Sequence, residues 1–325
     1  MINIYNNYGV EKMNNWLTVI SKVLPVIWLL CLGNILSRTN FLTQKTINDL
    51  KKIVVNISLP ALLFMAFAET KLEQKYLYLV LVIFLTCVLM LLLGMFLKRL
   101  VKVENIYYPT LFSGFETGMM GYSLFLTVYG AANMYKLALV DLGQVVFVFF
   151  VLVSYLGKLN GKTVSTKELT LSFLKSPVII AILSGILAGA TGITDVIKSF
   201  PLSNSFLETL QLLSTLTTSL ICLAIGYELK FDLKKIGFPL RTALLRIGIL
   251  LLSAYLINTL LVDGVFHLDR GFQIALYAMF LLPPPFVIPI YMEDKGELQK
   301  GLVLNTISIH IVLSIIGFLG LIVIY

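Results

Sequence analysis

The amino-acid sequence predicts an all-α integral membrane protein with ten transmembrane helices in two inverted five-helix repeats. Three observations support this prediction: the composition, the number of long apolar segments, and the alternation of basic residues between them. Of the 325 residues, 58% are hydrophobic and 13% are charged, and the mean hydropathy is +0.92. In soluble domains about a quarter of the residues are charged. A chain this apolar is typical of proteins that cross a membrane several times.

Ten apolar segments are long enough to span a bilayer. A helix needs roughly 20 apolar residues to cross a hydrocarbon core about 30 Å thick. The segments comprise residues 16–36, 47–68, 76–97, 107–128, 137–156, 171–191, 206–227, 239–262, 273–292 and 301–324. No strongly basic region precedes the first segment, so we expect it to be a membrane span rather than a cleaved signal peptide.

The basic residues predict the orientation of these segments. The formal net charge is +8. The odd-numbered connections between segments hold 17 Lys and Arg residues, whereas the even-numbered connections and the N-terminal segment hold 7. The positive-inside rule then places the odd-numbered connections in the cytoplasm and both termini outside the cell. We attribute the positive charge to this orientation in the plasma membrane and not to nucleic-acid binding.

The order of the segments predicts an inverted repeat. Five segments precede a basic loop at residues 157–175, and five follow it. An odd number of spans in each half makes the second half enter the membrane from the opposite face. We therefore predict a first repeat at residues 1–156, a cytoplasmic linker at 157–175, and a second, inverted repeat at 176–325.

Two polar or proline-rich interruptions fall inside the fourth and ninth segments, at residues 112–123 and 281–289. Glu116 lies roughly 13 Å along the fourth segment and Pro283 roughly 15 Å along the ninth, so both lie near the bilayer midplane. Unpaired backbone groups at that depth need partners from protein or a water-filled cavity. Gly and Pro also occur in membrane helices as packing contacts or kinks. Because both interruptions have the same rank and depth, we predict that broken helices 4 and 9 cross and form a binding site.

Glu116 is the strongest candidate for chemistry, because an ionisable residue near the bilayer centre is costly and is most often functional. We expect it to be protonated when the site is dry and ionised when water or a cation reaches it, which suits proton coupling. The alternative is a permanently neutral side chain that bonds a carbonyl of the broken helix.

The remaining candidates are small polar or helix-breaking residues near the two interruptions. The predicted substrate-binding residues are Glu116, Thr117, Gly118, Ser123, Asn56, Ser58, Pro283, Pro284, Pro285 and Asn305. The predicted ion-coupling residues are Glu116, Asp141 and Gln144. Asp141 and Gln144 share a helix face, but Asp141 lies about one turn from the outer end and could equally be a solvated interfacial carboxylate.

The sequence also predicts how an anion would be bound. Half-helix N-termini beyond each interruption offer free N–H groups and the positive end of the helix dipole to a substrate carboxylate. No buried basic residue is then required. Arg246 is expected to lie near the cytoplasmic end of the eighth segment and to extend its guanidinium to the interface.

Enzyme motifs are absent from the sequence. There is no H-E-x-x-H, no Walker A lysine loop and no C-x-x-C, and the three cysteines all lie inside apolar segments. We expect no catalytic residue, no cofactor and no metal. Without a nucleotide site, transport would have to be secondary rather than driven by ATP.

Several motifs resemble the auxin efflux carrier family, which includes plant carriers and bacterial permeases for malate, malonate and similar organic acids. They are found at residues 33–42, 56–64 (with LPALLF at 59–64), 114–123, 129–130, 141–144, 223–226 and 304–306. The resemblance implies ten spans with crossing broken helices, a scaffold part and a transport part, and a homodimer. The chain departs from the family pattern at Glu116, Ser123 and Gln144, where the family usually has Asn, Pro and Asn.

These observations together predict a secondary transporter of a small organic carboxylate that works by alternating access and is coupled to protons through Glu116. Three alternatives remain at this stage. One is sodium-coupled symport, another is a membrane sensor that binds a ligand without transporting it, and the third is a passive channel. The short connections argue against a sensor, because they leave no visible output domain.

Overall fold

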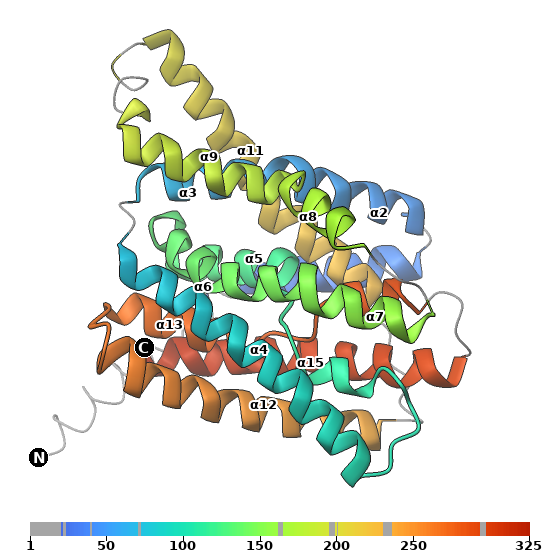
Figure 1. Ribbon diagram of the computed structural model, residues 1–325. Helices are drawn as coiled ribbons and strands as arrows, with labels where there is room; N and C mark the ends of the chain where they lie inside the picture. Colours follow the sequence, from blue (N-terminus) through green and yellow to red (C-terminus); the bar gives the residue numbers. More distant parts are fainter. Residues whose placement is uncertain are drawn as a thin grey trace, which may run out of the picture.

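The structure is a computed structural model that describes residues 21, 24–39, 41–70, 73–161, 165–194, 199, 201–229, 236–292 and 297–325. All regular structure in these ranges is helical (Figure 1). The predicted all-α class is thus confirmed for the described part of the chain. Part of the first predicted span, residues 16–20, 22 and 23, lies outside these ranges.

The helices follow the predicted apolar segments in order. In the first half they are a helix at Leu24–Arg38, α2 (Gln44–Ile53), η1 (Val54–Ser58), α3 (Leu59–Ala68), α4 (Gln74–Leu100), η2 (Tyr108–Phe112), η3 (Thr117–Gly121), α5 (Tyr122–Tyr129), η4 (Ala131–Asn133), α6 (Met134–Phe147), η5 (Val148–Leu152) and α7 (Val153–Leu159). In the second half they are α8 (Thr166–Leu174), α9 (Pro177–Thr191), α11 (Pro201–Glu228), α12 (Gly237–Ile257), η7 (Asn258–Asp263), α13 (Arg270–Phe280), α14 (Val287–Ile290) and α15 (Glu297–Ile324).

Six of the described helices are long and apolar enough to cross a membrane. They are Gln44–Ala68, Gln74–Leu100, Ala131–Leu159, Asn204–Glu228, Gly237–Asp263 and Gln299–Ile324. The bent pair formed by α8 and α9 would make a seventh. Large apolar side chains on α4, among them Leu89 and Phe96, are about 60% exposed, as expected where a helix faces lipid. The chain is therefore a multi-pass membrane protein whose described part is all-helical.

The sixth predicted segment begins earlier than its apolar run suggests. Residues 166–174, which fall inside the predicted linker at 157–175, form α8, and α9 follows at an angle of 58°. Pro177 starts α9 and has no backbone N–H, so it cannot continue the preceding helix. The described part of the predicted linker is therefore largely helical.

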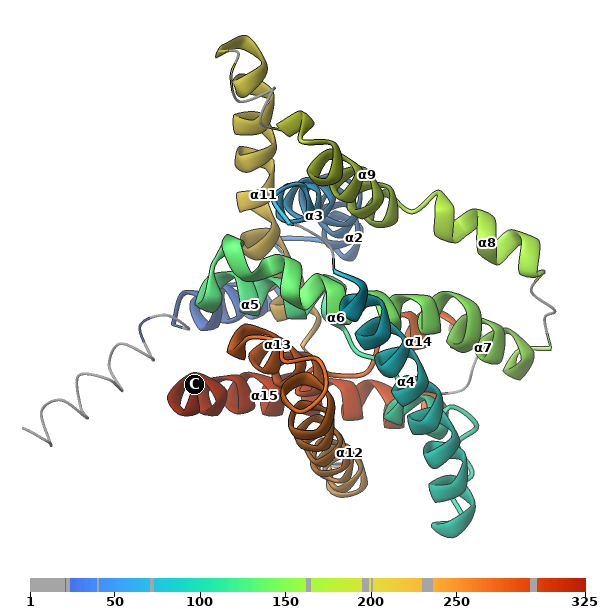
Figure 2. The same ribbon diagram turned by 60° about the vertical axis from the view of Figure 1, so that its left-hand side comes forward.

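The helices form two groups that both views show clearly (Figures 1 and 2). In the first group, α3 packs against α9 and α11. In the second, α6 packs against α4 and α13, and α12 packs against α13 and α15. The helix α5 lies between the groups and contacts both α11 and α6. The two interrupted segments belong to the second group, close to its boundary with the first.

The backbone of α11, in the first group, closely approaches that of the helix at Leu24–Arg38. A Cβ atom added at Gly226 of α11 would lie 2.1 Å from the carbonyl oxygen of Leu30, on the helix at Leu24–Arg38. Small residues allow this spacing, and the close van der Waals packing that results helps helices to associate in lipid.

Replacing Gly226 with Ala should therefore force these two helices apart and destabilise the protein by about 1–3 kcal/mol, the usual range for overpacking. Gly248→Ala on α12 is the matched control, because a Cβ there meets no atom within 4 Å. Thermal unfolding of both variants in the same detergent measures the difference. Equal midpoints would show that the helices do not approach this closely.

Candidate functional site

The first interruption separates η2 from η3. The 3-10 helix η2 ends at Phe112, Ser113 is extended, and Gly114 has a φ of +67°. This left-handed conformation favours glycine, because other residues carry a Cβ that clashes there. A Cβ at Gly114 would also lie 2.8 Å from Cγ of Pro285. Gly114 thus both turns the chain and lets the second interruption approach.

The second interruption separates α13 from α14. The helix α13 ends at Phe280, and the buried residues 281–285 that follow include three consecutive prolines. Proline has no N–H to donate and clashes with the preceding turn, so the helix cannot continue. The hydroxyl of Ser314, on α15, donates a hydrogen bond of 2.6 Å to the carbonyl oxygen of Leu281. A polar side chain from a neighbouring helix thus satisfies a carbonyl at the end of α13.

The two interruptions meet at Glu116. The backbone N–H of Glu116 donates to the carbonyl oxygen of Pro283 (2.9 Å). Its carboxylate accepts a hydrogen bond from the N–H of Met119 at Oε1 (3.2 Å) and from the N–H of Phe286 at Oε2 (2.6 Å). One buried carboxylate therefore caps the restart of both interrupted segments, where helix N–H groups lack intrahelical partners.

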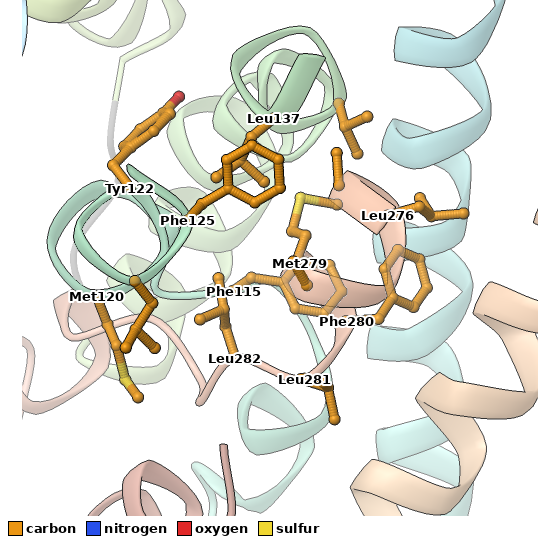
Figure 3. Packing of buried hydrophobic residues seen from close by; sticks show 14 of the residues in the cluster. Phe115, Met120, Tyr122, Phe125, Leu137, Leu276, Met279, Phe280, Leu281 and Leu282 are labelled. Carbon is orange, nitrogen blue, oxygen red and sulfur yellow. The ribbon is translucent and has the colours of Figure 1, made fainter. Parts of the chain in front are cut away.

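We call the place where the two interruptions meet at Glu116 the crossing. Apolar side chains cover one side of it. The rings of Phe115 and Phe280 lie with centroids 4.9 Å apart. Figure 3 shows these side chains beside Met279 and Leu282, so residues from both interruptions form one buried cluster. Gly118 lies on a more open side, because an added Cβ would meet only Oε1 of Glu116 within 4 Å, at 3.9 Å. The carboxylate of Glu116 therefore has space beside it at Gly118.

Two long polar side chains from other helices support the first interruption. Gln144, on α6, donates from Nε2 to the carbonyl oxygen of Phe115 (3.0 Å) and accepts from its N–H at Oε1 (3.4 Å). Arg246, on α12, donates to the carbonyl oxygens of Leu111 (2.8 Å) and Gly114 (2.6 Å). Both amide atoms of Gln144 are thus used by the backbone, although the sequence analysis predicted an ion-coupling role for this residue.

Arg246 differs from its predicted place at the membrane interface. Its side chain is fully buried, and its guanidinium lies 5.4 Å from the centroid of the Phe115 ring. The helix α12 begins at Gly237, which places Arg246 roughly 13 Å along it, a depth similar to that predicted for Glu116. A cation is favourable here because carbonyl groups at the end of a helix carry partial negative charge.

Asp141 is also buried and does not form a solvated interfacial carboxylate. Its exposed fraction is 3%, and Oδ2 accepts a hydrogen bond of 2.9 Å from the hydroxyl of Tyr122. The other oxygen, Oδ1, and Oγ1 of Thr117 form no hydrogen bond of acceptable distance and angle, although the side chains of Thr117 and Gln144 both lie close to this carboxylate. The burial has a simple cause, since α6 is covered by α5 on one side and by α4 and α13 on others.

The structure brings most, but not all, of the predicted site residues together. Those at the crossing are Glu116, Thr117, Gly118, Pro283, Pro284, Pro285, Asp141 and Gln144. Ser123 is buried one turn further along, where its hydroxyl bonds the carbonyl of Met119. Ser58 is buried in η1, which packs against α11, and Asn305 is buried on α15.

Asn56 lies away from this group. It is exposed, and its side-chain amide donates to the carbonyl oxygen of Lys52, one turn earlier on the same segment. The sequence predicted its segment but not the direction in which this side chain points: residues two apart lie on different faces of a helix, so Asn56 points outward while Ser58 is buried.

Sequence reasoning missed the supporting roles of Arg246 and Ser314, and it missed His310. His310 is fully buried, with Nδ1 3.2 Å from the hydroxyl of Ser314 and with Nε2 unpartnered. The available signal was the presence of polar side chains inside apolar segments, which is costly in a membrane.

Comparison of the chain with protein-family models and with curated proteins found no match.

Replacing Gln144 with Leu should leave the N–H and C=O of Phe115 buried without partners. We expect this change to destabilise the protein by about 1–3 kcal/mol. The control is Gln211→Leu on α11, at an exposed position. Heating both variants and measuring the fraction that stays monodisperse compares their stabilities, and a Gln144→Leu variant as stable as the control would exclude this supporting role.

Proposed function

We propose that the protein is a secondary transporter that moves a small organic carboxylate across the plasma membrane by alternating access. The observation that carries this proposal is the meeting of two interrupted helices at the buried carboxylate of Glu116. Interrupted helices in matching positions of two halves are the best indication of a transporter's binding site. Irregular backbone at membrane depth is tolerated only where it is buried in protein or lines a cavity.

We also propose that the chain has ten spans in two inverted repeats. The seven long or bent segments, the helix at Leu24–Arg38 and the two interrupted segments would together make ten. The interruptions then occupy the fourth position of each half, as an inverted repeat requires. The resemblance to the auxin efflux carrier family supports the same arrangement, in which the group of α3, α9 and α11 would be the scaffold and the other group the transport part.

Glu116 defines how a substrate carboxylate would bind. The N–H groups of Met119 and Phe286 are the donors that such a substrate would use, and Glu116 already occupies both. We infer that the substrate takes the place of this side chain, entering from the open side at Gly118. Because two carboxylates in one site repel each other, this exchange requires Glu116 to move away or to lose its charge.

The same observation favours a second candidate function. A fixed carboxylate beside open space is also suited to a cation, so the solute could carry an ammonium group or be accompanied by sodium. Removing Glu116 should strengthen the binding of a carboxylate but weaken the binding of a cation.

For a carboxylate substrate, Glu116→Ala should tighten binding, because the substrate no longer competes with the side chain for the two N–H groups. We expect at least about a tenfold lower Kd, because even one of these two hydrogen bonds to a charged group is worth about 1.5 kcal/mol. Thermal-shift titrations with a panel of small di- and monocarboxylates and of amines would measure it, with Glu168→Ala on the exposed face of α8 as control. Lost binding of an amine in Glu116→Ala would instead establish the second candidate.

Transport itself should appear as saturable counterflow of the binding carboxylate in liposomes containing the purified protein, and replacing sodium with choline should leave the rate unchanged. A sodium requirement would favour sodium symport, and non-saturable flux would indicate a channel. A carboxylate that binds but shows no counterflow would contradict the proposed transport function and favour a ligand sensor.

A further inference from the structure

The surroundings of Asp141 differ from those of Glu116 in one respect. Both carboxylates are buried at the crossing, but each oxygen of Glu116 accepts a backbone N–H, which suits an ionised carboxylate. Asp141 has one partner in good hydrogen-bond geometry, the Tyr122 hydroxyl on Oδ2, while the side chains of Thr117 and Gln144 lie close by. Its Oδ1 is buried without a partner. A buried acceptor left unpaired costs about 1–3 kcal/mol, more if it is charged.

The second unpartnered atom is next to it. Thr117 is fully buried, its side chain interacts with Asp141, and its Oγ1 has no hydrogen-bond partner. A proton on Asp141 would satisfy both atoms with one O–H···O bond, because a hydroxyl is also an acceptor. When the proton leaves, the hydroxyl of Thr117 can rotate and donate to the carboxylate instead. The pair therefore has a hydrogen bond in both protonation states.

The charged groups at the crossing also favour a proton there. Arg246 supplies one buried positive charge, while Glu116 and Asp141 are two buried acids. Lys51 also interacts with Glu116, but its charge is balanced by an ion pair with Glu228. Cys87, on α4, interacts with both Arg246 and Asp141, so the three lie in one region. With both acids ionised, this region would carry a net negative charge in a medium of low dielectric constant, which is expensive. One proton on either acid would neutralise that excess negative charge.

Among the residues that the structure describes, no cation interacts with Asp141. The titratable groups that interact with Asp141 are Tyr122, Glu116 and Cys87. The helix α3 contains no titratable side chain, and Arg270 and Tyr277 of α13 contact Tyr325 instead. A hard metal cation is a poor fit, because such ions take six or more oxygen ligands and this place offers two unpartnered oxygens.

We propose that Asp141 carries one exchangeable proton, shared with the hydroxyl of Thr117, and that this proton is the coupling ion. The coupling role rests on the proposed transport function, whereas the protonation does not. Thr117 is the first residue of η3 and directly follows Glu116. Loss of the proton from Asp141 reverses the donor and acceptor in its hydrogen bond with Thr117. This change takes place at the residue where the broken helix restarts. Asp141 thus binds the proton, and Thr117 is a positioning residue for it.

Infrared spectroscopy of the full chain in lipid, labelled with ¹³C-carboxyl aspartate, tests the protonation directly. We expect a protonated-carboxyl band near neutral pH that shifts with the label and disappears in Asp141→Asn. Thr117→Val should shift the band without removing it, because the proton loses its acceptor. Asp263→Asn, at an exposed position in η7, is the control and should leave the band unchanged. The absence of a labelled band in the wild type, or its persistence in Asp141→Asn, would overturn the proposal.

Counterflow and gradient-driven uptake in liposomes test the coupling separately. In the wild type, an inward proton gradient should stimulate carboxylate uptake. In Asp141→Asn, uptake should fall to the level measured without a gradient, while carboxylate counterflow continues. Wild-type flux that ignores the gradient would exclude the coupling role of Asp141. A normal infrared band in a protein with no flux of any carboxylate would support the protonated Asp141 and count against the proposed transport function instead.

Discussion

The structure depends on satisfying the backbone groups that two interrupted helices leave unpaired in a medium without water. Each such group costs several kcal/mol in hydrocarbon. The protein meets this requirement with side chains from four places: Arg246 on α12 for the carbonyls of the first interruption, Gln144 on α6 for Phe115, Ser314 on α15 for Leu281, and Glu116 for two N–H groups. The helices that supply these side chains must therefore keep fixed positions around the crossing.

This constraint separates what the sequence could predict from what it could not. The interruptions were predictable because Gly114 and the three prolines at 283–285 act locally, through backbone conformation and the missing N–H. The burial of Arg246 and of Asp141 was not, because it depends on which helices pack beside α12 and α6. The place of Asn56 was missed for another reason: Asn56 and Ser58 are two residues apart and therefore lie on different faces of the segment, of which only the one with Ser58 is buried. Chain length and hydropathy carry no information about that face.

The hydrogen bonds of Glu116 and Asp141 give these two acids different roles in the proposed mechanism. Glu116 has a backbone N–H on each oxygen and holds the place of a substrate carboxylate, whereas Asp141 has an unpartnered oxygen beside Thr117 and is suited to a proton. The sequence predicts Glu116, Asp141 and Gln144 as ion-coupling residues, with Glu116 as the leading proton carrier because of its depth in the membrane. In our proposal the hydrogen-bond partners of each carboxylate, which only the fold reveals, favour Asp141 as the residue that carries the proton. Alternating access would then link a proton at Asp141 to an exchangeable anion at Glu116 through Thr117, which follows Glu116 in the chain and has its side chain close to Asp141.

The central claim is that the carboxylate of Glu116 contacts the second interrupted helix, and solid-state NMR can test it directly. Protein labelled with ¹³Cδ glutamate and ¹⁵N phenylalanine should show dipolar dephasing from a carboxyl carbon within about 4 Å of an amide nitrogen, as expected for a hydrogen bond of 2.6 Å. This dephasing should disappear when Phe286 is replaced with Leu, which removes the labelled amide but keeps the backbone donor. Wild-type protein without such dephasing, or with dephasing that survives Phe286→Leu, would contradict the meeting of the two interruptions at Glu116.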